Sequence, residues 1–448
     1  MSLPRYGEYK DSGMLWLGHI PAHWELTRLK YLLSGVGAGG TPDTDKEGYW
    51  SLDDSGTPWV AIGDLSGRAN VLETAKSLTG DGIASKGLTI WPPGTLLFSM
   101  YASLGHTAEL MVPAAINQAI LALQPTKQTN QRFLNRWLEF LKPRLKEQAS
   151  SNTQDNLNAE KVRNLLALAI PIEEQTAIAA FLDREAAKID ALIAEQEKLI
   201  ALLAEKRQAT ISHVVTRGLN PAAPMKDSGV EWLGEVPAHW VITSLGKVAS
   251  ERCDGPFGSG IKSEHYTEEG AIVVRLQNIR AGAFNIGEPV YLDMVYFQSE
   301  LRHHEVFEGD LLVAGLGDGN NLLGRACVAP EGLGPALVKA DCFRFRLNTE
   351  QAISEFVAWQ LNAGAAYDAG VLATGTTRSR IPLSTMASRK VALPPAHEQR
   401  AVADFIRCEN SKLDALSLAA DRAILLLGER RSALIAAAVT GQIDVRNV

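Results

Sequence analysis

The sequence predicts an α+β protein with two globular domains and two long helices, which pair as an antiparallel coiled coil with internal pseudo-twofold symmetry. Three observations support this: a duplicated opening segment, two duplicated apolar heptad stretches, and two intervening stretches of nearly equal length but unlike sequence. The chain has 448 residues, too many for one ordinary core. The predicted boundaries are 1–170 (opening segment and first domain), 171–217 (helix), 218–394 (opening segment and second domain) and 395–448 (helix).

Composition indicates a globular chain that does not span a membrane. Hydrophobic residues make up 46% and charged residues 21%, a balance typical of a folded core with a polar surface. No apolar run is long enough to cross a bilayer, and the first residues lack the layout of a signal peptide. The four cysteines form no CxxC pair. We therefore expect a reduced, cytoplasmic protein.

The opening segment occurs twice. Residues 10–29, KDSGMLWLGHIPAHWELTRL, match residues 226–245, KDSGVEWLGEVPAHWVITSL, with both tryptophans in register. A second match follows in the same order, between PIEEQTAIAAFL at 171–182 and PAHEQRAVADFI at 395–406. Ordered internal matches indicate a duplicated module. The stretches between them are unlike each other, so two similar frames hold two different heads, 31–170 and 247–394.

A helical pattern follows each head. The helices begin at Pro171 and Pro395 and end near Gly218 and Gly441, residue types typical of these positions. Apolar residues recur every seven positions, which predicts a left-handed coiled coil. The predicted seam consists of Leu182, Ile189, Leu192, Leu199, Leu203, Ile406, Leu413, Leu416 and Leu427. A single amphipathic helix would leave its stripe in water, so we expect the two copies to pair. The alternative is a two-helix packing element without a measuring role.

Strands are expected in both heads, because alternating and β-branched residues recur there. The strand-like stretches are 57–67, 94–105 and 114–125 in the first head, and 271–282, 309–324 and 340–348 in the second. Two amphipathic helices, 131–148 and 354–367, occupy equivalent late positions.

Several short motifs occur in a characteristic order. KDSGxxWLGxxPAHW precedes each head, and PxxEQ opens each long helix. The first head contains GGTPDT (39–44), PWVAIGDL (58–65) and INQAI (116–120), and the second contains DGPFGSGIKSEHY (254–266), VVRLQNI (273–279) and TGTTRSRIPLSTM (374–386). Each motif alone is weak. The ordered set covers essentially the whole chain and resembles the specificity subunits of type I restriction–modification systems, with two different target-recognition domains.

The resemblance implies a non-catalytic chain that recognises an asymmetric, bipartite target in double-stranded DNA. Each head would read one half, and the helices would set the length of the unread spacer. The expected partners are two modification subunits that methylate adenine at N6 and, in a full restriction complex, two restriction subunits. No cofactor or metal is expected in this chain, because S-adenosylmethionine, ATP and Mg²⁺ would bind the partner subunits.

Two other classes of protein stay open at this point. A DNA methyltransferase with built-in specificity domains requires an Asn/Asp-Pro-Pro-Tyr/Phe motif, and Asp254-Gly-Pro-Phe257 lacks its first proline. The glycine-rich stretch Gly315–Gly319 resembles a phosphate-binding loop, but Asn320 stands where the motif requires a glycine. A coiled-coil adaptor that binds no DNA is compatible with the heptads alone. The strand-rich heads make it the less economical reading.

Candidate DNA contacts are side chains that can hydrogen-bond base edges or phosphates. In the first head these are Thr41, Arg68, Lys86, Asn117 and Gln118. In the second they are Ser259, Lys262, Arg275, Asn278, Arg280, Arg378 and Arg380. Asn117 and Gln118 are equally compatible with a structural turn, and the hydroxyl- and arginine-rich stretch 376–380 suits phosphate contact. For Trp16, Trp24, Trp232 and Trp240 a packing role is favoured, because the same residues precede two different heads.

The net charge of the chain is −7, and neither head has an excess of basic side chains. Since cationic contacts to phosphate supply most non-specific affinity for DNA, we expect the isolated chain to bind DNA weakly.

Overall fold

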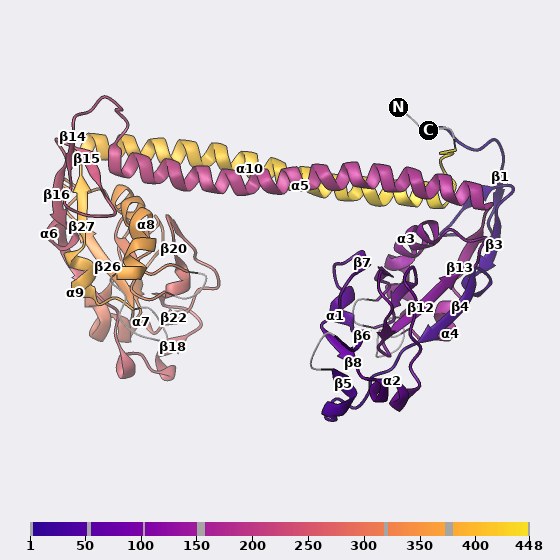
Figure 1. The fold of residues 1–448 in the computed structure, drawn as a ribbon. Coiled ribbons are helices and arrows are strands. Elements are labelled where there is room, and N and C mark those ends of the chain that lie inside the picture. Colours follow the sequence, from indigo (N-terminus) through magenta and orange to yellow (C-terminus); the bar gives the residue numbers. More distant parts are fainter. Residues whose placement is uncertain are drawn as a thin grey trace. The chain divides into compact units, whose positions relative to one another are not determined.

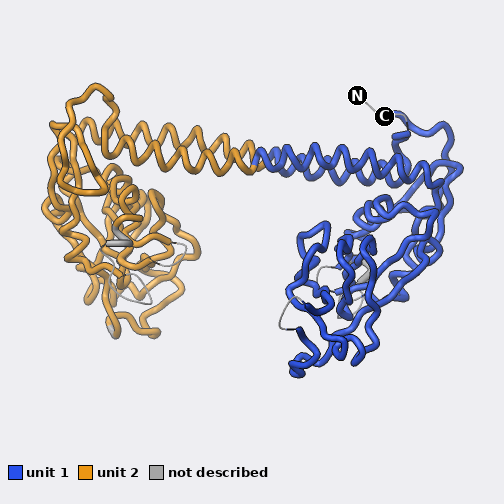
Figure 2. Tube along the Cα trace, in the orientation of Figure 1, with its two compact units in different colours: residues 1–196, 422–448 blue, residues 197–421 orange. Residues whose placement is uncertain are grey.

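The computed structural model divides the chain into two compact units, 1–196 with 422–448 and 197–421 (Figure 2). It describes residues 3–51, 55–101, 104–149, 157–317, 321–371 and 380–446. The predicted fold class is confirmed: both units mix helix and sheet, and helices α5 (Ile172–Arg217) and α10 (Ala396–Val439) are long. The compact units differ from the predicted segments, because each unit takes one head and part of each long helix. In the described part of the chain, no helix is long and apolar enough to cross a membrane.

The first unit opens with the hairpin β1 (Tyr9–Asp11) and β2 (His19–Pro21). Strand β3 (Glu25–Arg28) then pairs antiparallel with β13 (Leu166–Ala169). The head between them has two sheets (Figure 1). The first, in the order β4-β12-β9-β10-β7, comprises β4 (Leu33–Ala38), β7 (Asn70–Val71), β9 (Leu96–Ser99), β10 (Thr107–Leu110) and β12 (Ile120–Pro125). The second, in the order β11-β6-β8-β5, comprises β5 (Trp50–Ser51), β6 (Thr57–Val60), β8 (Lys76–Leu78) and β11 (Ala115–Ile116). The helices of the head are α1 (Ile62–Leu65), α2 (Gly80–Lys86), α3 (Gln131–Ala149) and α4 (Ala159–Arg163).

The second unit repeats this plan. Its hairpin is β14 (Met225–Asp227) with β15 (Glu235–Pro237), and β16 (Val241–Ser244) pairs with β27 (Lys390–Leu393). One sheet, in the order β17-β26-β23-β24, comprises β17 (Ala249–Cys253), β23 (Leu311–Ala314), β24 (Ala326–Val328) and β26 (Cys342–Leu347). The other, in the order β18-β22-β19-β25, comprises β18 (Tyr266–Thr267), β19 (Ala271–Val274), β22 (Tyr291–Leu292) and β25 (Ala336–Val338). The remaining elements are β20 (Ile279–Arg280), β21 (Ala283–Phe284), α6 (Leu245–Val248), α7 (Met294–Tyr296), α8 (Ser354–Val371) and α9 (Leu383–Ser388).

The two heads therefore share one order of eight strands although their sequences are unlike, and β7, at the edge of the first sheet, has no counterpart in this order. The order β4-β12-β9-β10 corresponds to β17-β26-β23-β24, and β11-β6-β8-β5 corresponds to β25-β19-β22-β18. The pairing of β11 with β6 is parallel in the first head, and so is the pairing of β25 with β19 in the second. Divergence has changed the side chains and loops of the heads and left the strand connections in place.

Within each unit the segments of α5 and α10 pair antiparallel. In the second unit, Arg207 of α5 forms an ion pair with Asp414 of α10. In the first unit the same two motif positions pair the other way round, with Arg431 Nε 3.4 Å from Asp190 Oδ1. The duplicated sequence thus forms the same cross-helix contact twice, as internal twofold symmetry requires.

Part of the predicted seam is wrong. Leu182, Ile189, Leu203, Ile406 and Leu413 are buried and Leu427 is half-buried, but Leu192, Leu199 and Leu416 are exposed. The second line of the seam lies four residues after the first, through half-buried Ile193 and Ile200, and not three residues after it. A heptad offers both spacings, and a helix turns 100° per residue, so choosing the wrong one moves the line onto the solvent face.

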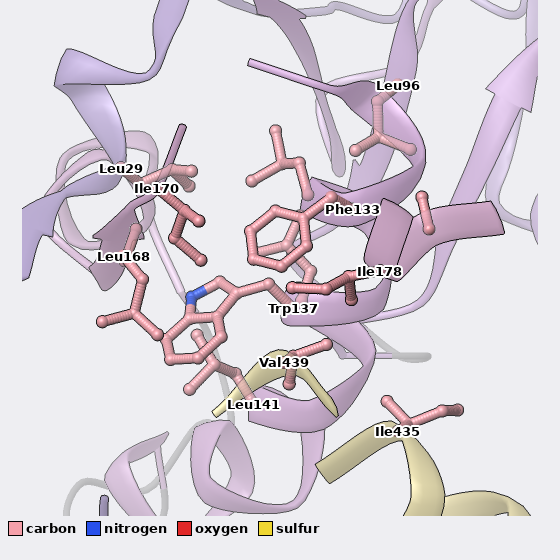
Figure 3. Close-up of a cluster of buried hydrophobic side chains, with 14 of the residues drawn as sticks. Leu29, Leu96, Phe133, Trp137, Leu141, Leu168, Ile170, Ile178, Ile435 and Val439 are labelled. Atoms are coloured by element: carbon pink, nitrogen blue, oxygen red, sulfur yellow. The ribbon is translucent and has the colours of Figure 1, made fainter. Parts of the chain in front are cut away.

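The core of the first unit joins the head to both long helices. Trp137 of α3 is fully buried, and its indole N–H donates to the carbonyl oxygen of Leu166 at 2.9 Å. Ile178 of α5, with Ile435 and Val439 of α10, belongs to the same buried cluster (Figure 3). The second unit has a matching cluster that combines Ile211 and Val215 of α5 with Val402 and Ile406 of α10. Each head is thus seated on a helix pair by continuous apolar packing.

Candidate nucleic-acid interface

A carboxylate, buried in the first unit and half-buried in the second, ties each opening segment to the start of a long helix. In the first unit, the indole N–H of Trp24 donates to Glu174 Oε2 at 2.7 Å, and His23 Nε2 lies 2.9 Å from the same atom. In the second unit, Trp240 and His239 contact Glu398 in the same way, at 3.0 and 2.7 Å. Both tryptophans are fully buried. The PAHW and PxxEQ motifs recur together because they are the two sides of one contact.

The glutamine of each PxxEQ motif ties the long helix to the end of its head. Gln175 Nε2 donates to the carbonyl oxygens of Ile170 and Gln128, while its Oε1 accepts from the backbone N–H of Asn130 at 2.8 Å. Gln399 makes the three equivalent bonds in the second unit, including one from the backbone N–H of Ile353 at 2.8 Å. A buried amide with three satisfied bonds fixes orientation, because any other rotamer leaves buried polar groups unpaired.

The C-terminal segment closes the first unit onto its own opening segment. Tyr9 Oη donates to the carbonyl oxygen of Gly441 at 3.0 Å, and the backbone N–H of Asp444 donates to the carbonyl oxygen of Pro4 at 2.8 Å. Gly441 and its counterpart Gly218 both adopt positive φ, 73° and 72°, where glycine carries no steric penalty. Both long helices therefore end next to a glycine of positive φ that lies against an opening segment.

Four of the five candidate DNA contacts in the first head lie around one turn. Thr41 Oγ1 donates to Gln118 Oε1, and Lys86 ends α2 beside Gly40 of the same turn. Gln118 is exposed, whereas Asn117 is buried and its Oδ1 accepts the backbone N–H of Ala119 at 3.0 Å. The structure therefore gives Asn117 a turn-forming contact and leaves Thr41, Lys86 and Gln118 at the surface of that turn.

Arg68 lies apart from this group. It lines a cavity of about 330 Å³ together with Arg136, Lys142 and Arg431. Arg136 and Arg431 in this cavity both contact Glu139, whose pKa is held low by the two arginines although burial opposes this. The cavity thus contains two arginines that are paired with Glu139, together with the cationic side chains of Arg68 and Lys142.

In the second head, Arg275 and Asn278 bracket one short turn. Asn278 is buried: its Oδ1 accepts the backbone N–H of Arg275 at 2.7 Å, and its Nδ2 donates to the carbonyl oxygen of Asn285 at 2.7 Å. Arg275 Nη2 donates to the carbonyl oxygen of Glu288 at 2.8 Å. Asp64 makes the equivalent bond to Ala61 in the first head. The matching bonds give Asn278 a structural contact in this turn.

The remaining candidates of the second head are at its surface. Arg280 Nη1 donates to Asn321 Oδ1 at 2.6 Å, and Lys262 Nζ lies 3.6 Å from Glu264 Oε1. Arg380 Nε donates to Asp341 Oδ1 at 2.6 Å. Arg378 and the side chain of Ser259 lie outside the described residues, as do residues 318–320 of the glycine-rich stretch.

Backbone hydrogen bonds align the two candidate surfaces residue by residue. The N–H of Asn117 donates to the carbonyl oxygen of Val60 at 3.0 Å, and that of Lys339 donates to Val274 at 2.9 Å. Lys339 is therefore the second head's counterpart of Asn117. Sequence analysis missed Lys339 because the two segments share almost no residues. Only the shared hydrogen-bond pattern identifies it.

One carboxyl group beside this surface, that of Asp254, has a raised pKa. Burial, together with the nearby charge of Asp341, raises the pKa of Asp254 to about 6. Its Oδ1 accepts the backbone N–H groups of Gly255 and Asp341 at 2.7 and 2.9 Å, which opposes the shift. The folded protein therefore binds this proton more tightly than the unfolded chain does, and ionisation above pH 6 costs stability.

We expect Asp254→Asn to make the second head more stable at pH 7.5. Asparagine keeps the Oδ1 acceptor and removes the charge. For this group, wild-type stability rises as pH falls from 7.5 through 6 towards 4, because the folded pKa exceeds the unfolded one. The measurement is the melting temperature at pH 5 and 7.5. The change in melting temperature between pH 5 and pH 7.5 should differ between the variant and the wild type. An identical pH dependence in both proteins would contradict the assignment.

No group of three or more His, Cys, Asp or Glu side chains in the described ranges could hold a metal ion. The duplicated anchors and the two heads of one topology define a class of protein, a recognition chain with two different heads on paired helices. The family model for the type I restriction modification DNA specificity domain matches residues 21–201.

Similarity to known proteins agrees with this match. The MjaX type I restriction enzyme specificity subunit of Methanocaldococcus jannaschii is 25% identical over 410 residues, 87% of this chain and 88% of that protein. The EcoKI specificity subunit of Escherichia coli is 24% identical over 285 residues, 62% of this chain and 57% of that protein. The chain is thus similar to type I restriction–modification specificity subunits over most of its length. The relatives it matches are named as specificity subunits.

Solved structures show the same fold. The HsdS subunit from Thermoanaerobacter tengcongensis has a TM-score of 0.56 at 15% identity and covers 97% of this chain and 99% of its own. A chain from a study of assembly and conformational transition in the type I R-M system has a TM-score of 0.65, also at 15% identity, and covers 94% and 98%.

Proposed function

We propose that this chain selects an asymmetric, bipartite DNA target, with one half read by each head and the spacer set by α5 and α10. The observation that carries the proposal is that one anchor, made by the PAHW and PxxEQ motifs, holds two heads of the same topology but different surfaces. Because both heads are anchored in the same way, they can approach DNA equivalently. Because their surfaces differ, they can read different sequences.

Two modification subunits are the proposed partners, and exposed leucines on the long helices support them. Leu192 and Leu416 hold equivalent positions in the duplicated sequence and are 50% and 52% exposed. Leu202 and Leu426 are likewise equivalent and exposed. Apolar side chains exposed at duplicated positions suit two identical partners on two equivalent faces. Adenine-N6 methylation with S-adenosylmethionine, and any restriction step that uses ATP and Mg²⁺, would then belong to cytoplasmic partner subunits.

Replacing the first head by a second copy of the second head is the test of the two-headed proposal. The variant carries residues 247–394 in place of 31–170 and is expressed with its modification subunit, and the methylated sequences are read genome-wide. The expected target contains the second half-site twice, as an inverted repeat, because the frame has internal twofold symmetry. The matched control is the wild-type chain. If both half-sites became new sequences, the proposal would be wrong.

The structure adds one requirement to this exchange. In the first unit, Arg132 and Arg136 of α3 pair with Asp183 of α5, at 3.3 and 3.0 Å. In the second unit the charges are reversed, since Glu355 of α8 pairs with Arg407 of α10. The exchanged chain should therefore also carry Asp183→Arg, so that the incoming glutamate meets a cation.

A further inference from the structure

The second head has a turn that corresponds to the Thr41 turn of the first. Gly39 lies so close to the carbonyl oxygens of Ile116 and Asn117 that a Cβ would overlap them. Gly255 lies equally close to the carbonyl groups of Val338 and Lys339. In each head a glycine-containing turn thus crosses the end of a parallel strand, and Phe257 occupies the place that Thr41 holds in the first head.

Phe257 forms the base of a stacked arrangement. Its side chain is 50% exposed. The guanidinium carbon of Arg380 lies 5.1 Å from the centre of the ring, and Arg380 Nε donates to Asp341 Oδ1 at 2.6 Å. An aromatic face on one side and a carboxylate at one edge therefore determine the orientation of this guanidinium.

Asp341, which makes this contact, adopts a left-handed backbone conformation that glycine adopts more readily. Its φ is +62°, the only positive φ of a non-glycine residue in the described part of the chain. The backbone there is fixed from both sides, since the N–H of Asp341 donates to Asp254 Oδ1 at 2.9 Å and its carbonyl oxygen accepts from Gly315 at 2.8 Å. Glycine would adopt this conformation without strain. A side chain kept where glycine would fit better points to a function of its carboxylate.

We propose that Asp341 is a positioning residue that holds Arg380 against Phe257, so that this guanidinium reads a guanine in the second half-site. The inference rests on the proposed function. An arginine held at two points loses little further freedom when it donates to guanine O6 and N7, the commonest specific contact of arginine in the major groove. A phosphate contact carries no sequence information, so it would not produce discrimination at a single base pair. Base reading by Arg380 thus replaces the phosphate contact expected for the stretch 376–380.

Asp341→Gly tests the inference without a folding penalty, because glycine relieves the strain at this φ. The full complex with its modification subunit is assayed for methylation of the wild-type target and of targets with one changed base pair. We expect the melting temperature to be unchanged or higher. We expect discrimination at one guanine of the second half-site to fall roughly tenfold, the effect of losing one bidentate contact. Arg380→Ala should relax the same position, and Asp341→Asn, which keeps an acceptor and tolerates this φ, should restore part of the discrimination.

The control variant is Glu331→Gln, which alters an exposed carboxylate of the same head and should leave discrimination unchanged. Equal loss of methylation on all targets after Asp341→Gly would indicate a phosphate contact and overturn the inference. Unchanged discrimination would overturn it as well. Failure of the proposed function is distinguishable, because the wild-type complex would then methylate no bipartite sequence at all.

Discussion

Lengthening both long helices by one heptad is expected to lengthen the unread spacer by about three base pairs while both half-sites stay the same. Seven residues add about 10.5 Å to an α-helix, which is close to three base-pair steps of 3.4 Å. A heptad also returns the inserted residues to the same face of the coiled coil, so the seam stays continuous. This is the largest change in target that any alteration outside the heads should produce.

The boundary between the compact units shows where to insert. The first unit ends at Gln196 in α5 and resumes at Arg422 in α10. Duplicating residues 190–196 and 415–421 would add one native heptad to each helix at these points and keep each unit's own contacts, such as Arg431 with Asp190. Sequencing of the methylated genome measures the spacer. An unchanged spacer in a stable, active variant would rule out a measuring role for the helices.

The matched control inserts the heptad into α5 alone. One lengthened helix cannot satisfy both the contact of Arg207 with Asp414 and that of Arg431 with Asp190. We therefore expect loss of stability from this variant, and no new spacer length.

Trp24→Ala is expected to destabilise the first unit by about 3–5 kcal/mol, the range for removing a fully buried tryptophan. The substitution also leaves Glu174 without its 2.7 Å hydrogen bond, although this carboxylate is only 4% exposed. Trp24→Phe separates the two effects, because it keeps most of the apolar area and loses only the N–H. That variant should cost about 1.5–3 kcal/mol, the contribution of one hydrogen bond to a charged group, because His23 still contacts Glu174.

Hydrogen–deuterium exchange resolved by peptide locates the effect. Peptides of the first head should lose protection in Trp24→Ala, while peptides from 249–393 keep theirs. Trp240→Ala should reverse the pattern, because Glu398 anchors the second head in the same way. Equal loss of protection in both heads after either substitution would show that the anchors do not act separately.

The sequence predicted the large features of the fold from physical regularities. Two matched segments in the same order indicated the duplication, and the prolines placed the starts of both long helices within one residue of those observed. The predicted end of the first helix also agrees, whereas the predicted segment 395–448 continues nine residues beyond the end of α10. The seam was predicted only in part. Leu192 and Ile193 are both apolar, and a spacing of three or four residues is equally compatible with a heptad, so only the partner helix selects Ile193.

Candidate DNA contacts were harder to separate from structural polar residues. Asn117 and Asn278 have the side chain that adenine recognition uses, yet each is buried and bonded to the backbone of its own turn. A sequence shows residue type, but not whether a neighbouring N–H group already occupies the acceptor. Nothing in the sequence distinguished Lys339 and Asp341. Their importance depends on where the end of the strand places them in the fold.

The sequence by itself determined the duplication and the paired helices, because these rest on periodicity and on matched residues within one chain. The tertiary structure alone decided why the duplicated motifs recur: Trp24 and Glu174 lie 150 residues apart and meet in one hydrogen bond. It alone also showed that two unlike heads share one topology. Strand order depends on backbone hydrogen bonds that many side-chain sequences satisfy equally well, so it can persist after the resemblance in sequence is lost.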